Sequence, residues 1–442
     1  MHVLVYANVG LNLIDGSTIW VQSITEVLSS LPGCLVTVLS RDRLEDRGVV
    51  PALKRIPNAR VVCCADYPDI FAQHSEPGDP AAIAKIIAHL DAEETLGRII
   101  VRAPDVALHL ARTESLRQRL WAYVLESPSL DIDGDRSTLT ELAEKAGGLI
   151  VQTDTQRGLL EAVIPAACNK TSVLPPMVKP VPAVPARGPK EGEAGPVRFI
   201  YSGKYSIGWN VEAFFDVPEA CARAGVDATV TMIGDKVHNE KSDREFRNRI
   251  LNKFTSTPGV TWLGPMEREA AIAEAARHDL GLCWRTDALD DSLEISTKFL
   301  EFAFMGVPAV VNRTAAYESL LGEDYPYFAA TMNDVVAAAQ AVAKDRERHE
   351  QIRQRCRELA TGFTYEAAAE RLRNALRLRK PPSRIAKAKT KVLVASHDLK
   401  FLNEALRWIR ASERYEILHD RWASSVRHDE QHSKALLAEA DV

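Results

Sequence analysis

The sequence predicts an α/β protein with two doubly wound domains that face each other across a cleft. Three observations lead to this prediction. Short apolar, β-branched segments alternate with helical patterns along most of the chain. A proline-rich stretch interrupts this alternation near the middle. The 442 residues are also too many for one ordinary domain and suit two or three.

The first 174 residues show a regular succession of strand and helix patterns. The strand His2–Ala7 leads through a glycine-containing loop into a helix that begins near Ser17. We expect further strands at Leu35–Leu39, Ala59–Cys64, Arg98–Arg102 and Gly148–Gln152. Helical patterns such as Pro80–His89 and Thr138–Ala146 precede the last two. Residues 1–174 therefore form the first predicted domain, with a parallel sheet and crossover helices.

Seven prolines lie between Pro175 and Pro196, with almost no apolar periodicity. Proline cannot occupy a central strand or a helix interior without the loss of a hydrogen bond. We therefore interpret residues 175–196 as a linker between domains. A long loop inside a single domain is the alternative interpretation.

The alternation resumes after the linker, and residues 197–380 form the second predicted domain. Its expected strands are Val197–Gly203, Ala228–Gly234, Val260–Leu263, Leu280–Trp284 and Ala309–Asn312. Its expected helices are Asn210–Ala224, Arg244–Phe254, Arg268–Arg277, Ser296–Met305, Val335–Thr361 and Tyr365–Arg379. A basic linker, 381–390, precedes a strand–helix–strand pattern in 391–442 that resembles the start of a further domain.

Composition and charge narrow the class of protein. The chain is 46% hydrophobic and 26% charged, which is typical of globular proteins. Its net charge of −5 gives no general basic surface, so a nucleic-acid partner is not expected. The seven cysteines lack CxxC spacing and favour reduced core residues over a metal site. No signal peptide or membrane-spanning pattern is present, which favours a cytoplasmic location.

A basic run extends from Arg371 to Lys391 and contains nine Lys and Arg residues. A solvated helix end followed by a linker is one interpretation. The other is a peripheral contact with anionic lipid, or with a lipid-diphosphate acceptor, at the inner face of the membrane.

The most specific motif is STKFLEFAFMGVPAVV, which spans residues 296–311. It resembles the donor-site signature of retaining GT-B glycosyltransferases of the large family-4-like group, in the subgroup T-K-x-x-E-[YF]-x-x-x-G-x-P-x-V. The resemblance implies two Rossmann-like domains and a nucleotide sugar as donor. It also implies that the helix N-terminus at Ser296 and Thr297, together with Lys298, faces the diphosphate. Glu301 is then expected to accept hydrogen bonds from the ribose hydroxyls.

Further landmarks of the family occur in the expected order. The resemblance implies that Ser202, Gly203 and Lys204, at the end of the strand FIYSGK, face the donor phosphates. Gly234 ends the next strand, and Gly264 ends the strand VTWLG that usually flanks the base. The second basic residue of the family is absent from YSIGW at 205–209, which leaves phosphate neutralisation to Lys204 and Lys298.

The paired glutamates of the family usually stand eight positions apart, and this sequence departs from that spacing. Eight positions before Glu301 is Leu293, and the neighbouring acid is Glu294. Glu294 is either a contact to the donor sugar or a solvated loop acid.

Candidate residues of the first domain follow predicted strands. Asp15, Gly16 and Ser17 lie where a loop meets a helix, and such a backbone can approach a phosphate or an acceptor sugar. Arg102 and Glu126 follow apolar runs and are candidate acceptor or sugar contacts. A plain turn is the alternative interpretation of the loop that joins the first strand to this helix.

The expected reaction is glycosyl transfer with retention, in cell-surface polysaccharide synthesis, to a glycan or lipid-linked acceptor. The expected catalytic residues are Lys204, Lys298 and Glu294. The resemblance implies no metal and no cofactor; Asp131-Ile132-Asp133 has the form of a metal motif but lies in a polar loop. The chain also resembles the front part of a multidomain polymer-synthesising enzyme. A non-catalytic sugar-binding scaffold and a nucleotide-sugar 2-epimerase remain open, whereas a dehydrogenase would need a GxGxxG that neither domain supplies.

Overall fold

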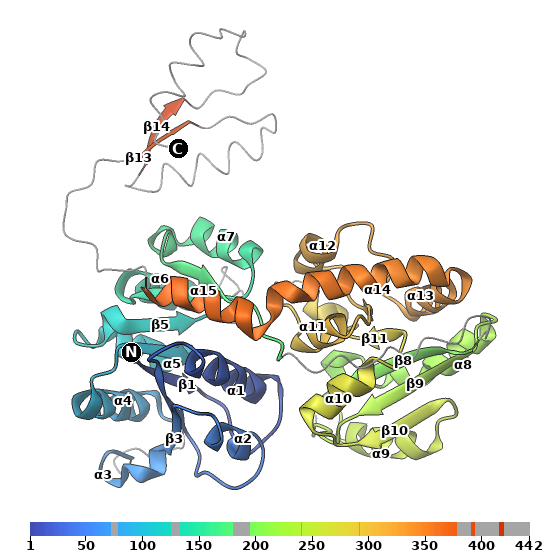
Figure 1. The fold of residues 1–442 in the computed structure, drawn as a ribbon, viewed down its shortest axis with the longest axis horizontal. Coiled ribbons are helices and arrows are strands. Elements are labelled where there is room, and N and C mark those ends of the chain that lie inside the picture. The colour runs from blue at the N-terminus through green and yellow to red at the C-terminus, as the bar shows by residue number, and fades with distance from the viewer. Residues whose placement is uncertain are drawn as a thin grey trace.

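The computed structural model describes residues 1–71, 78–124, 133–179, 195–239, 241–290, 292–377, 390–393 and 415–419. Two α/β lobes lie side by side (Figure 1), each built on its own parallel sheet. We call the lobe that contains strands β1–β7 the first lobe and the lobe that contains β8–β12 the second lobe.

The first sheet has seven parallel strands in the order β3-β2-β1-β4-β5-β6-β7. The central strand β1 is buried at five of its six residues, the near-continuous apolar pattern of a strand covered on both faces. The strand order reverses between β1 and β4, so the carboxyl ends of these two strands form the topological switch point. The strands are β1 His2–Ala7, β2 Leu35–Ser40, β3 Ala59–Cys63, β4 Arg98–Arg102, β5 Leu120–Tyr123, β6 Gly148–Val151 and β7 Thr171–Val173.

Helices cover both faces of the first sheet. Helix α1 starts with a capping box, in which Asp15 and Thr18 satisfy each other's backbone N–H groups. Helices α1 and α2 contribute to one apolar core, and α4, α5 and α6 to another on the opposite face. The helices of this lobe are α1 Gly16–Ser29, α2 Val50–Lys54, α3 Pro68–Phe71, α4 Pro80–Glu94, α5 Pro104–Arg112, α6 Asp133–Lys145 and α7 Asp154–Val163.

The second sheet has five parallel strands in the order β10-β9-β8-β11-β12. Its switch point lies between β8 and β11. The strands are β8 Val197–Ser202, β9 Ala228–Ile233, β10 Val260–Gly264, β11 Leu280–Leu282 and β12 Ala309–Val310. The helices are α8 Val217–Arg223, α9 Phe246–Ser256, α10 Arg268–Ala275, α11 Thr297–Phe304, α12 Ala315–Leu321, α13 Met332–Lys344 and α14 Arg346–Ala360.

Two expected helices of this lobe differ from the prediction. The expected helix Asn210–Ala224 is interrupted: a 3-10 turn at Ala213–Asp216 precedes the short helix α8, whose first turn contains Pro218. The expected helix Val335–Thr361 is two helices, because the side chain of Asp345 accepts a hydrogen bond from the Arg348 N–H and caps α14.

Helix α15 (Tyr365–Arg377) returns from the second lobe to the first. It lies within the stretch expected to form the second domain, yet its apolar face packs against α1. Ala368, Leu372 and Leu376 belong to the core of the first lobe, and Arg98 donates a hydrogen bond to the Leu376 carbonyl at 3.0 Å. Figure 1 shows α14 over the second lobe and α15 crossing the first.

Beyond α15 the structure describes two short strands, β13 Thr390–Leu393 and β14 Tyr415–His419, which pair in parallel. The helical part of the pattern expected in 391–442, most of the basic linker 381–390, and residues 180–194 of the proline-rich linker lie outside the described residues. Among the helices that are described, none has the length and apolar character that a bilayer crossing requires.

Candidate functional site

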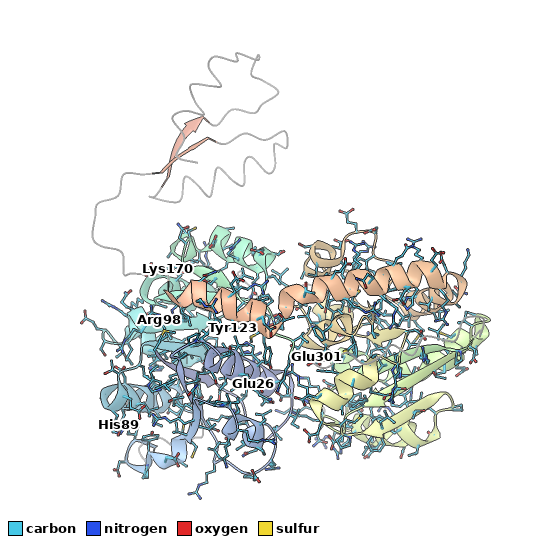
Figure 2. All side chains as sticks on the ribbon, in the orientation of Figure 1. Glu26, His89, Arg98, Tyr123, Lys170 and Glu301 are labelled. Carbon is cyan, nitrogen blue, oxygen red and sulfur yellow. The ribbon has the colours of Figure 1, made fainter. Side chains whose placement is uncertain are left out.

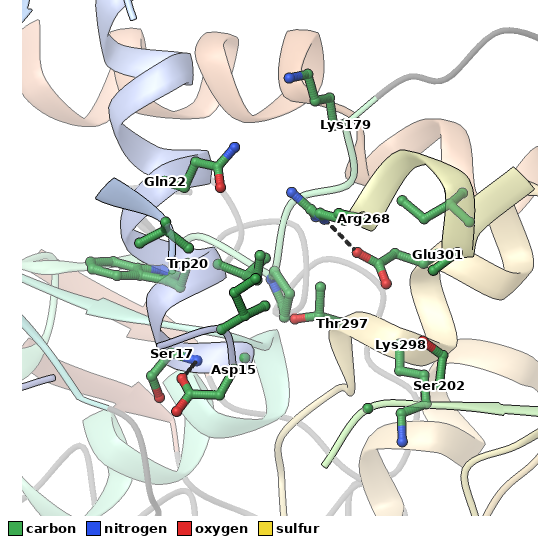
Figure 3. Close-up of a pocket in the computed structure, with 18 of the residues that line it drawn as sticks. Asp15, Ser17, Trp20, Gln22, Lys179, Ser202, Arg268, Thr297, Lys298 and Glu301 are labelled. Carbon is green, nitrogen blue, oxygen red and sulfur yellow. Dashed lines mark hydrogen bonds and ion pairs between the residues drawn. The ribbon is translucent and has the colours of Figure 1, made fainter. Parts of the chain in front are cut away.

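A cleft of about 1320 Å³ separates the two lobes. Its first-lobe wall includes the start of α1, Arg102 at the end of β4, and Gln152 after β6. Its second-lobe wall includes the loops after β8, β9 and β10 and the start of α11 (Figure 3). The cleft therefore lies at the carboxyl ends of both sheets, where open α/β folds bind ligands. Figure 2 shows Glu26 and Glu301 on the sides of the lobes that face each other.

Two glycines of the second lobe bring their loops close together. Gly203 and Gly234 have backbone φ angles of +142° and +116°, which residues with a side chain rarely adopt. A Cβ on Gly234 would lie 2.4 Å from the Gly203 carbonyl oxygen. A Cβ on Gly203 would lie 3.3 Å from Cε of Lys298. The absence of a side chain at these two positions lets the β8 loop, the β9 loop and Lys298 lie close together.

The N-terminus of α11 lies in the cleft wall. Ser296 is the N-cap residue but its side chain makes no capping hydrogen bond, and its own N–H donates to the Tyr317 hydroxyl at 3.2 Å. Thr297 and Lys298 form the first turn, and all three residues line the cleft. The first turn of a helix carries N–H groups without intrahelical partners and a partial positive charge, which together favour an anion.

Lys298 is half-buried in this wall, with its ammonium 3.7 Å from the centre of the Tyr201 ring. No described carboxylate lies within ion-pair distance of it. Burial lowers the pKa of Lys298 to about 8, and the nearby charges of Arg285 and Lys204 act in the same direction. A bound anion would remove this destabilisation of the ammonium. The site is therefore electrostatically prepared for a negative group.

Arg285 and Lys204 lie near Lys298, against the ring of Trp209. The Lys204 ammonium is 4.4 Å and the Arg285 guanidinium carbon is 5.6 Å from the centre of the Trp209 ring. The backbone of Arg285 is fixed by Asn312, which accepts from its N–H at 2.7 Å and donates to its carbonyl at 2.9 Å. We call Lys204, Arg285 and Lys298 the donor-wall cations.

Local sequence patterns do not indicate Arg285. The family usually carries a second basic residue shortly after the position of Lys204, and residues 205–209 contain none. The structure brings one from another loop, because β11 pairs with β8 and the residues after both strands reach the same switch point. The signal in the sequence was a lone arginine three positions beyond an apolar strand.

Glu301 forms an ion pair that local sequence patterns did not indicate. Nε of Arg268 donates to Oε1 of Glu301 at 2.8 Å (Figure 3), and both side chains are largely buried. Another nitrogen of Arg268 donates to the Ser23 hydroxyl and the Tyr365 hydroxyl, each at 3.3 Å. Arg268 thus connects the second lobe to α1 and α15. Oε2 of Glu301 makes no hydrogen bond with the described residues, and Glu301 lines the cleft.

Asp15 is occupied by structural partners. Its Oδ1 accepts from the N–H groups of Ser17 and Thr18 at 3.0 and 3.1 Å, and its Oδ2 lies 2.9 Å from the Lys236 ammonium of the other lobe. Burial alone would raise the pKa of Asp15, but the hydrogen bonds and the charge of Lys236 hold it below the usual value. Gly16 and Ser17 line the cleft beside it.

The remaining candidates fall in different places. Arg102 and Glu294 line the cleft, and their charges influence each other. Gly264 does not line it; its carbonyl accepts the Gly234 N–H at 2.9 Å and so supports the β9 loop. Glu126 lies outside the described residues, as does most of the Asp131-Ile132-Asp133 motif. Within the described ranges, no three His, Cys, Asp or Glu side chains converge in a way that could hold a metal ion.

This chain is similar to known glycosyltransferases in part of its sequence and in its fold. Residues 220–374 match a family model described as "Glycosyl transferase-like". Sucrose-phosphate synthase from Thermosynechococcus elongatus is 14% identical, with a TM-score of 0.64 over 85% of this chain and 98% of that one. HepE of Anabaena, solved with UDP-glucose, is 14% identical, with a TM-score of 0.60 over 85% and 99%. This chain has the GT-B fold.

The pneumococcal O-GlcNAc transferase GtfA, solved with UDP and GlcNAc, shares the GT-B architecture. It is 11% identical, with a TM-score of 0.63 over 85% of this chain and 98% of that one. No curated protein matches the sequence. At these identities the likeness establishes the GT-B fold, as the sequence predicted, and the function has to be argued from the site.

Proposed function

We propose that the protein is a glycosyltransferase that moves a sugar from a nucleoside-diphosphate donor to a glycan or lipid-linked acceptor, with retention of the anomeric configuration. The observation that carries the proposal is the set of donor-wall cations at the N-terminus of α11. Two of them, Lys298 and Arg285, have no described carboxylate partner, and both line the cleft. Two such cations at a helix N-terminus fit a diphosphate.

The chemistry follows from where charge develops. The bond between the anomeric carbon and the diphosphate oxygen breaks heterolytically, so negative charge grows on the leaving group. Lys298, Arg285 and the N–H groups of the α11 first turn stabilise that charge. The leaving phosphate oxygen can take the proton of the acceptor hydroxyl, so no separate base is required. The proposed reaction uses no cofactor and no metal, because the fixed cations supply the electrostatic stabilisation.

Two glutamates would place the donor. Oε2 of Glu301 is available to accept from the ribose hydroxyls, while Arg268 holds Oε1 and fixes the orientation of the carboxylate. Glu294 lines the cleft two residues before the N-cap of α11 and would contact the transferred sugar. Gly203 and Gly234 would let the backbone approach the diphosphate.

The cellular role belongs to the same proposal. A lipid-linked acceptor would bring the protein to the inner face of a membrane, and the basic run from Arg371 onward supplies positive charge for such a contact. One member of the run serves the fold instead, since Arg371 donates a hydrogen bond to the Gly362 carbonyl at 2.6 Å. A role in cell-surface polysaccharide synthesis fits these features.

The experiment begins with a thermal-shift screen of UDP, GDP and ADP, because a ligand at 100 times its Kd stabilises by about 2.7 kcal/mol. The matching sugar nucleotides are then assayed for hydrolysis and transfer, and NMR of the product reports the anomeric configuration. Arg285→Gln should weaken the selected diphosphate about tenfold to hundredfold without unfolding. Arg313→Gln, which breaks an exposed pair with Glu318, serves as control.

The outcomes separate the alternatives. Binding without hydrolysis or transfer would favour a non-catalytic scaffold. Release of a free epimerised sugar would favour an epimerase. Unchanged diphosphate binding in Arg285→Gln and in Lys298→Met would contradict the assignment of the donor wall.

A further inference from the structure

The cleft contains a cation that is separate from the donor wall. Arg102 is the last residue of β4 and lines the cleft from the first lobe. Its guanidinium carbon lies 5.2 Å from the centre of the Trp20 ring and 6.0 Å from that of Tyr123. Its Nε is buried without a hydrogen-bond partner. The side chain makes no hydrogen bond or ion pair with any described residue.

Three other cations that line the cleft differ from Arg102 in this respect. Lys236 pairs with Asp15, Lys179 pairs with Glu26 and Glu269, and Arg268 pairs with Glu301. The chain therefore compensates the cations that hold the lobes together and leaves Arg102 uncompensated. Removing a guanidinium from water without a partner costs free energy, and arginine keeps its charge in proteins. A ligand anion would supply the missing partner.

The nearest carboxylates do not fill this role. The charges of Glu294 and Asp15 act on Arg102, but neither lies within ion-pair distance of it. Asp15 is also committed to Lys236 and to the cap of α1. The guanidinium lies over the aromatic rings of Trp20 and Tyr123, and these cation–π contacts stabilise its charge only weakly.

The position of Arg102 separates it from the donor diphosphate. Arg102 lies at the switch point between β1 and β4 of the first sheet, whereas Lys204 and Arg285 lie at the switch point between β8 and β11 of the second. Residues at both switch points line the same cleft. A donor bound at the second-lobe wall leaves the first-lobe wall for the acceptor.

We propose that Arg102 binds an anionic group of the acceptor, a phosphate or a carboxylate. This inference rests on the proposed glycosyltransferase function and narrows its acceptor class. The guanidinium offers paired N–H donors that match the two oxygens of either group, which an ammonium cannot do. The acceptor is then a phosphorylated or acidic sugar, or a lipid-linked phosphate, and the arms of the experiment distinguish these sources.

The test uses the full chain and the sugar nucleotide that it hydrolyses. Acceptors are offered in matched pairs: glucose against glucose 6-phosphate, glucose against glucuronate, and vesicles that carry a polyprenol against vesicles that carry a polyprenyl phosphate. Wild-type protein should prefer the charged member of at least one pair. Arg102→Gln should lower kcat/KM for that member about hundredfold and leave donor hydrolysis and donor affinity unchanged.

Two further variants sharpen the comparison. Arg102→Lys keeps the charge but not the paired donors, so it should recover only part of the preference. Arg112→Gln, which changes an exposed arginine of the same lobe paired with Glu141, should behave as wild type. Circular dichroism and thermal unfolding confirm that each variant is folded.

Three results would overturn the inference: equal use of charged and neutral members, no turnover of any charged probe, or a preference that survives in Arg102→Gln. Loss of donor affinity in Arg102→Gln would also overturn it, because Arg102 would then serve the donor. A wild-type protein that neither binds nor hydrolyses any sugar nucleotide would instead reject the proposed function itself.

Discussion

The ammonium of Lys236 lies 2.9 Å from Oδ2 of Asp15, and this ion pair joins the second lobe to the first across the cleft. Asp15 also caps α1 through its other carboxylate oxygen. One residue therefore sets the start of α1 and the contact between the lobes. Changes at Asp15 should affect both, and two substitutions can separate them.

Asp15→Asn should keep the cap and lose the charge, whereas Asp15→Ala should lose both. We expect Asp15→Ala to cost about 1 to 2 kcal/mol of unfolding free energy and Asp15→Asn less than 1 kcal/mol at neutral pH. Urea unfolding at pH 7 measures the difference. Equal losses in the two variants would contradict the separation of cap and bridge.

The same carboxylate has a predictable pH dependence. Its folded pKa lies below the unfolded value of about 3.9, so the ion pair contributes fully above that value. The contribution disappears as the pH falls through the folded pKa, because both states are then protonated. The stability difference between wild type and Asp15→Asn should therefore shrink below about pH 4.

Lys298→Met should lower turnover while the fold persists. The lysine lies against Tyr201 without a described carboxylate, so its removal breaks no ion pair. Loss of one group that stabilises developing charge typically lowers kcat by about 10²–10³. We expect no loss of stability at pH 7, because the variant no longer buries an ammonium. Normal turnover by a folded Lys298→Met would contradict the proposed role.

The lowered pKa of Lys298 also predicts how the activity of the free enzyme depends on pH. With a pKa of about 8, the ammonium deprotonates as the pH rises through 8, so kcat/KM for the donor should fall there. The unfolded state keeps this proton to about 10.5, so wild type should gain stability relative to Lys298→Met between about pH 8 and 10.5. If kcat/KM did not fall near pH 8, the charge of Lys298 would not be needed for donor turnover.

Much of the fold could be predicted because buried parallel strands are continuous apolar runs. The expected His2–Ala7 and Arg98–Arg102 agree with β1 and β4 at both ends. The strands that escaped prediction are short: β5 directly follows a 3-10 turn, and β7 has three residues at the edge of the sheet. Periodicity has too few residues to act on in such segments.

The site divides in a similar way between local and distant residues. Gly203, Gly234 and the start of α11 lie in local motifs, and the structure places all of them around the cleft or in its wall. Arg285 comes from another loop and Arg268 from the start of α10, and their partners are tens or hundreds of positions away. Sequence spacing carries no information on such pairings, which depend on sheet order and on the approach of the lobes.

Gly234→Ala tests the close approach of the β8 and β9 loops. The added Cβ would lie 2.4 Å from the Gly203 carbonyl oxygen, at a φ of +116°. We expect a loss of about 2 to 4 kcal/mol of unfolding free energy, together with weaker diphosphate binding. Gly158→Ala is the matched control, because its Cβ meets no atom within 4 Å and it lies inside helix α7. It should stabilise the protein by about 0.5 to 1 kcal/mol, and a similar loss in both variants would contradict the steric argument.

The Arg268–Glu301 pair should contribute to stability as well as to donor binding. Glu301→Gln leaves a guanidinium whose side chain is 11% exposed without its carboxylate, and we expect a loss of about 2 to 5 kcal/mol. Glu318→Gln, which breaks the exposed pair with Arg313, should cost less than about 1 kcal/mol.

A double variant separates the two roles of Glu301. Arg268→Met combined with Glu301→Leu removes both charges, so it should recover much of the stability that Glu301→Gln loses. It should still bind the donor poorly, because no carboxylate remains for the ribose. Urea unfolding and titration with the selected nucleoside diphosphate measure the two effects on the same protein. If donor affinity returned together with stability, Glu301 would be a residue that positions the lobes and not one that contacts the nucleotide.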